Sequence, residues 1–368
     1  MAHLYPMIRS AMWKIRRLVR KPQPTQFGEP WMLGELIVND DGVEASGYAL
    51  PPLGAAPSLS RFLLNDKRFG YVEYPNRSEN VGAAIVYRNA SHVGFRLKSG
   101  IPKEGLYPNG YMTLRYEHPL RGNAWYHDSY FVLPPSERKP LPEGERRIRV
   151  AGKALDEPFH RAGFTDFMRI HHLCEDRFGR GFSKLNRVLD WGCGCGRVVR
   201  YFDRFPNVQA TGADVDADNI GWCKANLPGI RFAAVPLMPR TEFADGSFDL
   251  IYGISVFTHL REKAQFAWLE ELRRISAPGA IVVMSFHGRS AYQYLRAPDS
   301  WLETIQAKGF HITSSNGQLD AVIEDKDYYV NVGHSHDYIR SQWSKYFDFV
   351  DFIPGFIGTH DVVVMRRT

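Results

Sequence analysis

The sequence predicts an α/β protein in which a parallel sheet, covered by helices on both faces, follows an N-terminal all-β sandwich domain. Two patterns support this fold class. From Arg187 onward, short apolar runs alternate with helical segments, which is typical of a parallel sheet between two layers of helices. Between Trp31 and Pro134, short runs of alternating polarity are separated by turn residues, which indicates antiparallel strands. The 368 residues suffice for two folded units.

The first 27 residues are expected to form a basic tail. They contain six lysines and arginines and no acidic residue, whereas the remaining 40 basic and 40 acidic residues of the chain cancel. Apolar residues at helical spacing could make residues 6–21 an amphipathic helix that attaches peripherally to an anionic membrane surface. The alternative, which we favour, is a mobile tail or a helix that packs on its own protein.

Residues 28–135 are expected to form the β-sandwich module. The sequence SGYALPP, followed by a strand and an N-x-x-F hairpin, is loosely similar to β-sandwich modules attached to bacterial glycan-processing enzymes, and this is an analogy only. Tyr71, Tyr74 and Trp125 could recognise a glycan, although filling the sandwich core is the commoner role of such side chains. A proline-rich and charged linker, residues 136–156, is expected to join the two units.

Residues 157–368 are expected to form the α/β domain, with a helix over 157–178 before the first strand. The expected strands cover Arg187–Trp191, Val208–Asp214, Ile230–Val235, Asp249–Ser255 and Ala280–Phe286, and the expected helices follow Gly196 and cover Ala217–Asn226 and Glu262–Ile275. Residues 289–332 interrupt this alternation with a short helix and a hairpin. We interpret this insertion as a candidate lid over the substrate.

The organising element is the stretch Arg187–Phe202, RVLDWGCGCGRVVRYF. A short apolar run ends in Asp190, and glycines follow at three alternate positions, Gly192, Gly194 and Gly196, before a helix is expected to begin. Glycines are needed because so tight a turn requires positive φ and because a ligand can touch the backbone only where no Cβ intervenes. The spacing differs from that of a phosphate-binding loop, and no Gly-Lys-Ser/Thr follows. The loop therefore predicts a nucleotide-like ligand, and a pyrophosphate is the weaker interpretation.

This stretch resembles motif I of the class I S-adenosylmethionine-dependent methyltransferases, whose sheet is Rossmann-like. A second apolar run ends at Asp214, 24 residues after Asp190, and Phe243–Leu260 and Ala277–Gly288 resemble the fourth- and fifth-strand motifs of the same family. Four motifs in this order make the resemblance specific. The resemblance implies S-adenosylmethionine as the cofactor and an antiparallel final strand, which we expect over His360–Met365.

The resemblance also implies which residues contact the cofactor. The glycine loop would line its methionine part with Asp190 near the ammonium group, and Asp214 would accept both ribose hydroxyls. We expect Asp216 to cap the helix that follows. The expected cofactor-binding residues are Asp190, Gly192, Cys193, Gly194, Gly196, Asp214, Val215, Pro236, Leu237 and Ser255. Many relatives carry an Asp beside the adenine where this chain has Val235, Pro236 and Leu237, which puts that contact in doubt.

Two sequence motifs that other acceptors require are absent, which narrows the acceptor atom to oxygen. Members of this family that methylate amide or base amino groups usually carry Asn/Asp-Pro-Pro-Tyr/Phe after the fourth strand, where this chain has GISVFTH, and cytosine carbon methylation needs a Pro-Cys nucleophile. A hydroxyl acceptor requires a base with a pKa near neutrality, which histidine supplies. His287, directly after the fifth strand, is the first candidate for the catalytic base and His259 is the second. For each of them the alternative is a hydrogen-bonded structural histidine.

These features predict an S-adenosylmethionine-dependent O-methyltransferase that acts on a sugar, glycan or glycolipid hydroxyl by in-line SN2 transfer, with no metal ion. The alternatives are a scaffold that binds the cofactor without activity and an RNA methyltransferase. Nucleic acid is not an expected partner, because the folded part carries no net positive charge. Four cysteines, no signal peptide and no apolar run near 18 residues favour the cytoplasm, with membrane association at its inner face as an option. The oligomeric state stays open.

Overall fold

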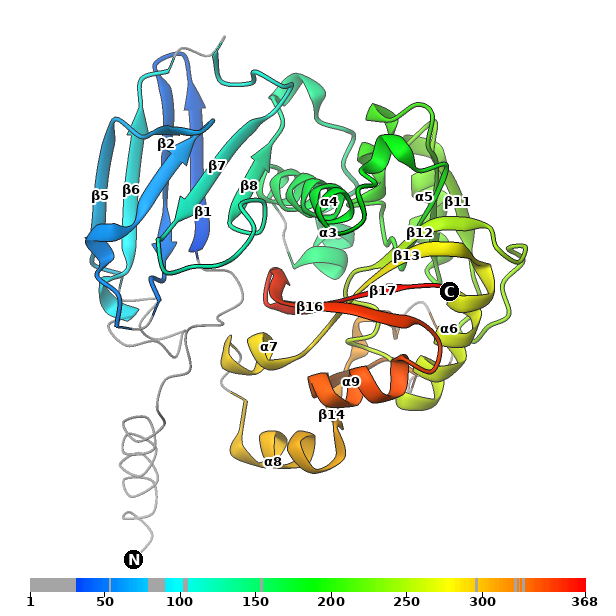
Figure 1. Ribbon diagram of the computed structural model, residues 1–368. Coiled ribbons are helices and arrows are strands. Elements are labelled where there is room, and N and C mark those ends of the chain that lie inside the picture. Colours follow the sequence, from blue (N-terminus) through cyan, green and yellow to red (C-terminus); the bar gives the residue numbers. More distant parts are fainter. Residues whose placement is uncertain are drawn as a thin grey trace, which may run out of the picture.

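A computed structural model describes residues 31–52, 54–78, 90–101, 105–152, 155–294, 297–320, 323, 325 and 328–368. The expected basic tail, and with it the membrane contact predicted for residues 6–21, lies outside the described residues. The chain forms a β-sandwich beside a mixed sheet that is flanked by helices (Figure 1). The predicted fold class, an α/β domain with an N-terminal all-β part, is confirmed.

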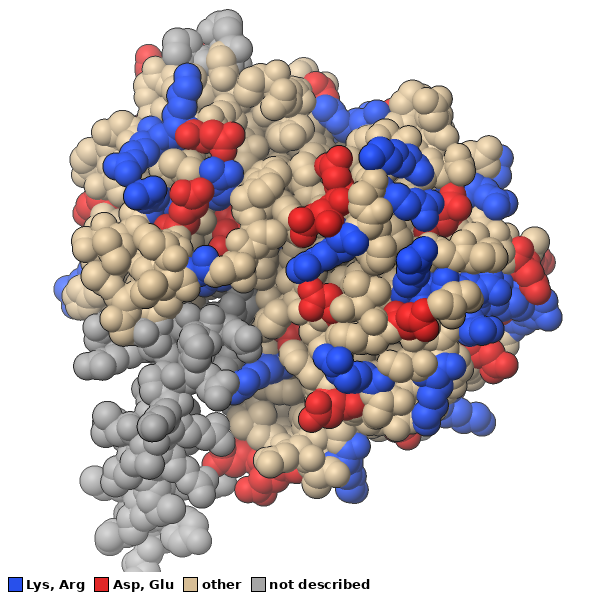
Figure 2. Space-filling view, in the orientation of Figure 1, with Lys and Arg blue, Asp and Glu red and all other residues tan. Residues whose placement is uncertain are grey.

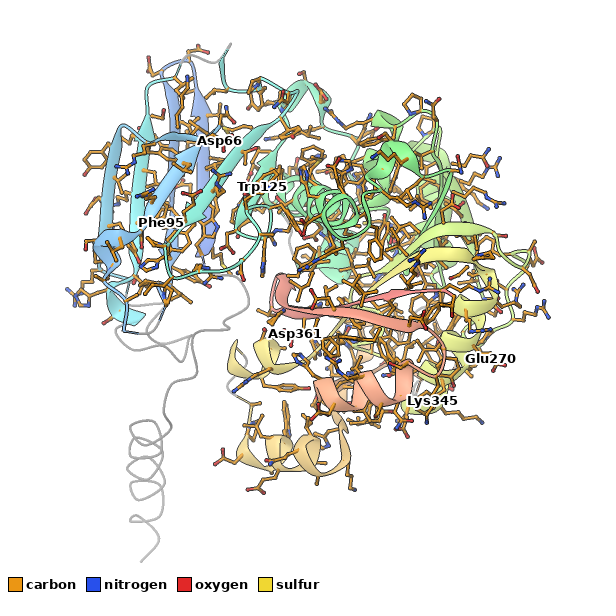
Figure 3. The ribbon with its side chains drawn as sticks, viewed as in Figure 1. Asp66, Phe95, Trp125, Glu270, Lys345 and Asp361 are labelled. Atoms are coloured by element: carbon orange, nitrogen blue, oxygen red, sulfur yellow. The ribbon has the colours of Figure 1, made fainter. Side chains whose placement is uncertain are left out.

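The N-terminal part consists of two four-stranded sheets in the orders β1-β2-β6-β5 and β4-β3-β7-β8. Its elements are β1 (Trp31–Asn39), β2 (Gly42–Ala49), η1 (Pro57–Leu59), β3 (Arg61–Leu64), β4 (Lys67–Arg68), β5 (Tyr71–Asn76), η2 (Ala90–His92), β6 (Gly94–Ser99), β7 (Met112–Glu117), β8 (Ser129–Val132) and η4 (Pro135–Glu137). Trp31, Phe62 and Phe95 pack between the sheets with ring centroids 5.0 to 6.2 Å apart, and Figure 3 shows Phe95 in this interior. These aromatic side chains provide much of the buried apolar surface of the sandwich.

The C-terminal part is built on one seven-stranded sheet in the order β11-β10-β9-β12-β13-β17-β16. Its elements are α3 (Gly144–Ala151), α4 (Asp156–Phe178), η5 (Phe182–Lys184), β9 (Arg187–Trp191), η6 (Val199–Arg204), β10 (Gln209–Asp214), α5 (Ala217–Asn226), β11 (Arg231–Ala234), β12 (Phe248–Gly253), α6 (Glu262–Ile275), β13 (Ser276–Phe286), α7 (Arg289–Tyr294), α8 (Asp299–Lys308), β14 (Phe310–Ser315), η7 (Gly317–Leu319), β15 (Val330–His334), α9 (His336–Trp343), β16 (Asp348–Ile357) and β17 (His360–Arg366). The first five strands are parallel and follow the doubly wound order. β17 runs antiparallel to β13 and β16, which confirms the antiparallel final strand.

Both faces of this sheet are buried, as the near-continuous apolar strands require. Consecutive residues belong to opposite layers: Val188 and Val283 lie in the core cluster that contains side chains of α4 and α5, whereas Leu189 and Val282 lie in the cluster that contains side chains of α6 and α9. This alternation follows from the two-residue period of a strand. The four apolar side chains are therefore all shielded from water. With both faces covered by helices, a ligand can reach this sheet only at the ends of its strands.

The segment after the glycine loop corrects one prediction. Helical turns were expected from Arg197, but the chain passes through turns and forms only the 3-10 helix η6, which begins at Val199. The buried Arg200 guanidinium donates to the carbonyls of Gly196 (2.7 Å) and Cys195 (2.8 Å). An α-helix would use the Gly196 carbonyl as the acceptor for the Arg200 backbone N–H. The Arg200 side chain uses one lone pair of that carbonyl, and the segment forms turns and the 3-10 helix η6 instead of an α-helix.

Helix α4 holds the sandwich against the sheet domain. Arg161 donates to the carbonyls of Leu33 (2.7 Å) and Gly34 (3.1 Å) on β1, and Arg169 donates to the carbonyl of Ser129 (3.2 Å) on β8. The two arginines are only 6% and 1% exposed. A buried guanidinium is costly without partners, so these contacts strongly favour the docked arrangement. The sandwich is a packed part of the molecule rather than a module on a tether.

The insertion between β13 and α9 is attached to the sheet by its strand β15. Val330 N donates to the carbonyl of His259 (3.0 Å), Val332 N donates to that of Thr258 (2.9 Å), and His334 N donates to that of His287 (2.9 Å). β15 thereby crosses the carboxyl ends of β12 and β13. These bonds hold β15 in place over the carboxyl ends of the two strands. That the whole insertion acts as a lid stays a prediction.

Charged side chains are interspersed over the face shown in Figure 2, with acidic residues beside most basic ones and a gathering of basic side chains at its right-hand edge. No helix within the described residues is long and apolar enough to cross a bilayer.

Candidate active site

A cavity of about 520 Å³ lies beyond the carboxyl ends of β9, β10 and β12. Its walls come from α3, the glycine loop, the residues after β10 and β12, η7 and the start of β15. The order of the strands reverses between β9 and β12. Doubly wound sheets bind ligands at such a switch point, so this cavity is the candidate active site.

The glycine loop shows the conformation that the sequence predicts. Gly192, Gly194 and Gly196 have φ values of 74°, 54° and 69°. A Cβ on Gly192 would lie 2.2 Å from Val256, and one on Gly194 would lie 2.9 Å from Val150. Any larger residue would therefore be strained and crowded at both positions. Gly192 and Gly194 line the cavity, whereas Gly196 faces the interior.

Asp214 lines the cavity at the end of β10. Its Oδ2 accepts from Gly194 N (2.7 Å) and its Oδ1 accepts from Asp216 N (2.8 Å). Burial raises the pKa of this carboxyl to about 6, against the opposing effect of those two hydrogen bonds. Each oxygen keeps a further lone pair, so the carboxylate can accept hydrogen bonds from two hydroxyl groups of a ligand.

Asp190 lies beneath the loop rather than on the cavity wall. It is 3% exposed, and its Oδ2 accepts from Val199 N (3.2 Å), so the carboxyl links β9 to η6. Burial raises its pKa to about 7. Cys193 is also buried behind the loop. Contacts of Asp190 and Cys193 with the cofactor stay predictions.

Asp216 caps α5, as the sequence predicts, by accepting from Asn219 N (3.0 Å). It also accepts from Arg149 Nη2 (2.7 Å), and Arg146 donates to Asn219 Oδ1 (3.0 Å). Both arginines belong to α3, inside the segment that was expected to be a linker. Ile148, Arg149 and Val150 line the cavity, and the sequence analysis missed them. Arg146 and Arg149 are spaced three residues apart, which places both on one face of a helix, and this spacing could have indicated α3.

The chain after β10 and β11 contributes less of the wall than the sequence predicts. Val215 and Val235 line the cavity, but Pro236 and Leu237 are not among its lining residues. The Leu237 carbonyl instead accepts hydrogen bonds from Trp268 Nε1 (3.0 Å) and from the Tyr328 hydroxyl. Contacts of Pro236 and Leu237 with the cofactor stay predictions.

His259 also lines the cavity. We call the part of the wall formed by His259 with Ser315, Asn316, Gln318, Tyr329 and Asn331 the acceptor end, and the part formed by α3, the glycine loop, Asp214 and Asp216 the cofactor end. Its Nδ1 lies 3.2 Å from the Val330 carbonyl, which can only accept, and Asn331 is a second hydrogen-bond partner. The Val330 carbonyl favours a proton on Nδ1, and in that tautomer the Nε2 lone pair faces the Ser255 hydroxyl at 3.3 Å. Asn316 Nδ2, an amide donor, also lies 3.3 Å from Nδ1 and can hydrogen-bond it only in the other tautomer. Burial lowers the pKa of His259 to about 4, so the ring is neutral at physiological pH.

His287 does not line the cavity. It donates from Nδ1 to the Val332 carbonyl (3.1 Å), and its ring lies against His360, with centroids 4.8 Å apart. Burial lowers its pKa as well. Of the two histidines that the sequence singled out, only His259 faces the space where an acceptor would bind.

The aromatic residues of the sandwich lie away from this cavity. Tyr74 packs on Phe62 (5.2 Å) and donates to a backbone carbonyl, which is a core role. Trp125 packs against His172 of α4 (4.6 Å), and Figure 3 shows it between the sandwich and that helix. Tyr71 is 50% exposed on the edge strand β5. Glycan recognition by the sandwich stays a prediction.

One group of side chains on α4 has the composition of a metal site. The donor atoms of His171, His172 and Glu175 lie within 4.8 Å of one another. However, His171 Nδ1 accepts from Phe182 N (3.1 Å), so its Nε2 carries the ring proton in the neutral form. In this arrangement, His171 cannot offer its Nε2 lone pair to an ion.

Residues 188–279 match the model of a methyltransferase domain family. Tocopherol O-methyltransferase of Arabidopsis thaliana is 26% identical over 187 residues, which cover 48% of this chain and 51% of that protein. 2-Methyl-6-phytyl-1,4-hydroquinone methyltransferase of Synechocystis sp. is 32% identical over 101 residues, which cover 27% of this chain and 31% of that protein. The chain thus spans about half or less of the length of these curated relatives.

A solved structure of 1,6-didemethyltoxoflavin-N1-methyltransferase from Burkholderia thailandensis, with bound S-adenosylhomocysteine, aligns with 65% of this chain and 96% of its own. The sequence identity is 15% and the TM-score is 0.39. The family match shows a methyltransferase domain over residues 188–279, in agreement with the predicted class I fold, for which S-adenosylmethionine is the expected cofactor.

Proposed function

We propose that this chain is an S-adenosylmethionine-dependent O-methyltransferase that methylates a hydroxyl group of a sugar, glycan or glycolipid. The observation that carries the proposal is the position of His259. A neutral imidazole lines the same cavity as Asp214 and the glycine loop, and its Nε2 lone pair faces the cavity residue Ser255. The base for a hydroxyl acceptor and the cofactor-binding motif therefore share one site.

The cofactor end fits S-adenosylmethionine. Gly192 and Gly194 offer backbone without a Cβ, and Asp214 has lone pairs left for the two ribose hydroxyls. The cofactor, when bound, supplies a methyl group already activated by a positively charged sulfur. The residues of the chain then have two tasks: to hold the acceptor hydroxyl in line and to take its proton.

His259 is the candidate for the second task. It is neutral at physiological pH, so its Nε2 can accept a proton in the Nδ1–H tautomer. Burial holds its pKa at about 4, below the near-neutral value expected of such a base from the sequence. As the acceptor oxygen attacks, its proton leaves toward Nε2. The imidazolium that forms keeps its Nδ1–H bond to the Val330 carbonyl, which stabilises the positive charge.

The composition of the acceptor end supports an uncharged and hydroxyl-rich acceptor. The charged residues of the wall, Arg149, Asp214 and Asp216, all belong to the cofactor end, and Arg149 and Asp216 neutralise each other. The acceptor end offers amide and hydroxyl groups from Ser315, Asn316, Gln318, Tyr329 and Asn331. Such groups suit sugar hydroxyls, whereas a phosphate-rich RNA would require cations.

A phenolic hydroxyl is the second candidate acceptor. The Arabidopsis relative is a tocopherol O-methyltransferase by name. Aromatic side chains at the acceptor end could pack on a phenol ring. The Tyr329 ring stacks on His259 with centroids 4.5 Å apart and an angle of 28°. An acceptor screen should therefore hold sugars, glycolipids and phenols side by side.

The test compares His259→Ala with His287→Ala in methyl-transfer assays and in calorimetric titrations with the cofactor. His259→Ala should slow transfer by roughly 100-fold or more, because a general base contributes about that much. Cofactor affinity should stay within about twofold in both variants, and His287→Ala should transfer at nearly the wild-type rate. Full activity of His259→Ala would move the base elsewhere. Cofactor binding without transfer to any hydroxyl would favour the scaffold alternative.

A further inference from the structure

We propose that Ser255 is a catalytic residue that relays the acceptor proton to His259, rather than a cofactor contact as the resemblance implied. The proposal rests on the proposed methyl transfer to a hydroxyl. It concerns one side chain at the carboxyl end of β12, which lines the cavity and faces the base.

The backbone of Ser255 is held in an unusual conformation. Its φ is +61°, in the left-handed region. The other described non-glycine residues with positive φ are Asn65 and Asp66, which form the two-residue turn between β3 and β4, where this conformation is ordinary. Ser255 lies in no hairpin turn, and its N–H is held by Ser285 Oγ at 2.7 Å. A strained serine on a cavity wall indicates a functional constraint on where its side chain lies.

The side chain of Ser255 lies between a buried hydroxyl and the base. Its Oγ is 3.1 Å from Thr258 Oγ1, which is fully buried, and 3.3 Å from His259 Nε2. In the tautomer in which Nδ1 of His259 donates to the Val330 carbonyl, Nε2 has the lone pair and Ser255 is the donor in that contact. The relay requires this tautomer. The Ser255 oxygen can then accept from Thr258 on one side and from a hydroxyl in the cavity on the other.

The other groups around His259 leave Nε2 to Ser255. Tyr329 stacks on the ring face, Asn316 Nδ2 lies 3.3 Å from Nδ1, and Asn331 is a further hydrogen-bond partner of the ring. His287 is 6.2 Å away between ring centroids and makes no hydrogen bond to His259 that the structure describes. The serine hydroxyl is therefore the group that connects the reactive nitrogen to the cavity.

In the proposed relay, two protons move in one concerted step. As the acceptor oxygen forms its bond to the methyl carbon, its proton passes to Ser255 Oγ while the Ser255 hydroxyl proton passes to His259 Nε2. The methyl–sulfur bond breaks with its electron pair going to sulfur. The positive charge thereby moves from sulfur to the imidazolium, and Ser255 ends the step as a neutral hydroxyl.

The test uses the full chain with Ser255→Ala and Ser255→Gly. Both lose the hydroxyl, but glycine adopts the positive φ without strain, so a shared kinetic defect cannot result from poor folding. We expect kcat to fall about 10- to 100-fold in both variants, within the range of general acid–base effects. Calorimetric affinity for S-adenosylmethionine should stay within about twofold. Ser247→Ala, on the exposed loop before β12, is the matched control and should behave as wild type.

Two further readouts separate a relay from a packing role. The wild-type rate, plotted against the fraction of heavy water in the solvent, should follow a curve, because two protons are transferred. The same plot for the variants should be a straight line. Nitrogen NMR of His259 without cofactor should show a shifted Nε2 signal in Ser255→Ala, because its donor is gone.

Three results would overturn the relay: a wild-type kcat in both variants, a tenfold loss of cofactor affinity, or an unchanged His259 signal. A fast Ser255→Ala with a slow His259→Ala would remove the relay and leave the proposed function standing. A fast His259→Ala would remove both.

Discussion

The two ends of the cavity are built in different ways. The cofactor end is assembled from the glycine loop, Gly192 to Gly196, and from Asp214, which follows within a few tens of residues. The acceptor end joins His259 to the Asn316 and Asn331 side chains of an insertion that lies 57 and more residues further along the chain. Local backbone conformation therefore determines the first end, and long-range hydrogen bonds determine the second.

Burial acts on opposite types of group at the two ends. At the cofactor end it raises the pKa of Asp190 to about 7 and that of Asp214 to about 6. At the acceptor end it lowers the pKa of His259 to about 4. Desolvation disfavours the charged form in each case. The two ends should therefore respond to pH with opposite sign, and substitutions at one end should leave the other largely intact.

Of the substitutions that distinguish the two ends of the cavity, Asp214→Ala should have the largest effect, and the effect should be on cofactor affinity. The variant loses the acceptor for Gly194 N and Asp216 N as well as the ribose contact, and hydrogen bonds to a charged group contribute about 1.5–3 kcal/mol each. We expect cofactor affinity to fall by roughly 100-fold or more, measured by calorimetry, while circular dichroism stays that of the wild type. Unchanged affinity would contradict the assignment of the ribose site to Asp214.

The second effect is a pH dependence of cofactor affinity. The folded-state pKa of Asp214 lies above its unfolded value of 3.8, so its protonated form is favoured until the pH rises through about 6. In the expected ribose contact Asp214 acts as the carboxylate, so affinity should rise between pH 5 and pH 7, by at most about tenfold per pH unit. Calorimetric titrations across this range check it, and Asp214→Asn should remove most of the slope.

The same linkage predicts how the ligand-free protein responds. The stabilising contribution of the protonated Asp190 and Asp214 carboxyls is present at low pH and is lost as the pH rises through 6 to 7. For His259 the folded pKa lies below the unfolded value of 6.5, so its contribution is present above that value and is lost as the pH falls toward 4.

The smallest effect should come from Asn331→Asp at the acceptor end. A carboxylate at this hydrogen-bond partner of His259 favours the imidazolium and should raise the pKa of His259 by roughly one unit. The acid limb of the kcat profile should move up by about the same amount, while cofactor affinity at pH 8 stays unchanged. Asn226→Asp, on α5 away from the cavity, makes the same charge change and should leave the profile in place. A common shift in both variants would mean that the effect is not local to His259.

The sequence predicted the cofactor end well because its signals are local. Strand periodicity predicted the core strands, and the family resemblance predicted the antiparallel final strand over His360–Met365, which in the structure ends at Arg366. The positive φ of the three loop glycines follows from their spacing at the end of a strand. The α-helix expected after Gly196 is absent. The Arg200 side chain hydrogen-bonds the Gly196 carbonyl there, and no local propensity reports such a contact.

The sequence by itself determined the fold class, the family and the position of the cofactor loop, because strand alternation and backbone conformation depend on neighbouring residues. Only the tertiary structure decided that His259 rather than His287 faces the cavity, that Arg149 of an expected linker joins its wall, and that Arg161 holds the sandwich to the sheet domain. Each of these depends on which distant segment satisfies a buried polar group. Burial and hydrogen bonding make that choice when the chain has folded.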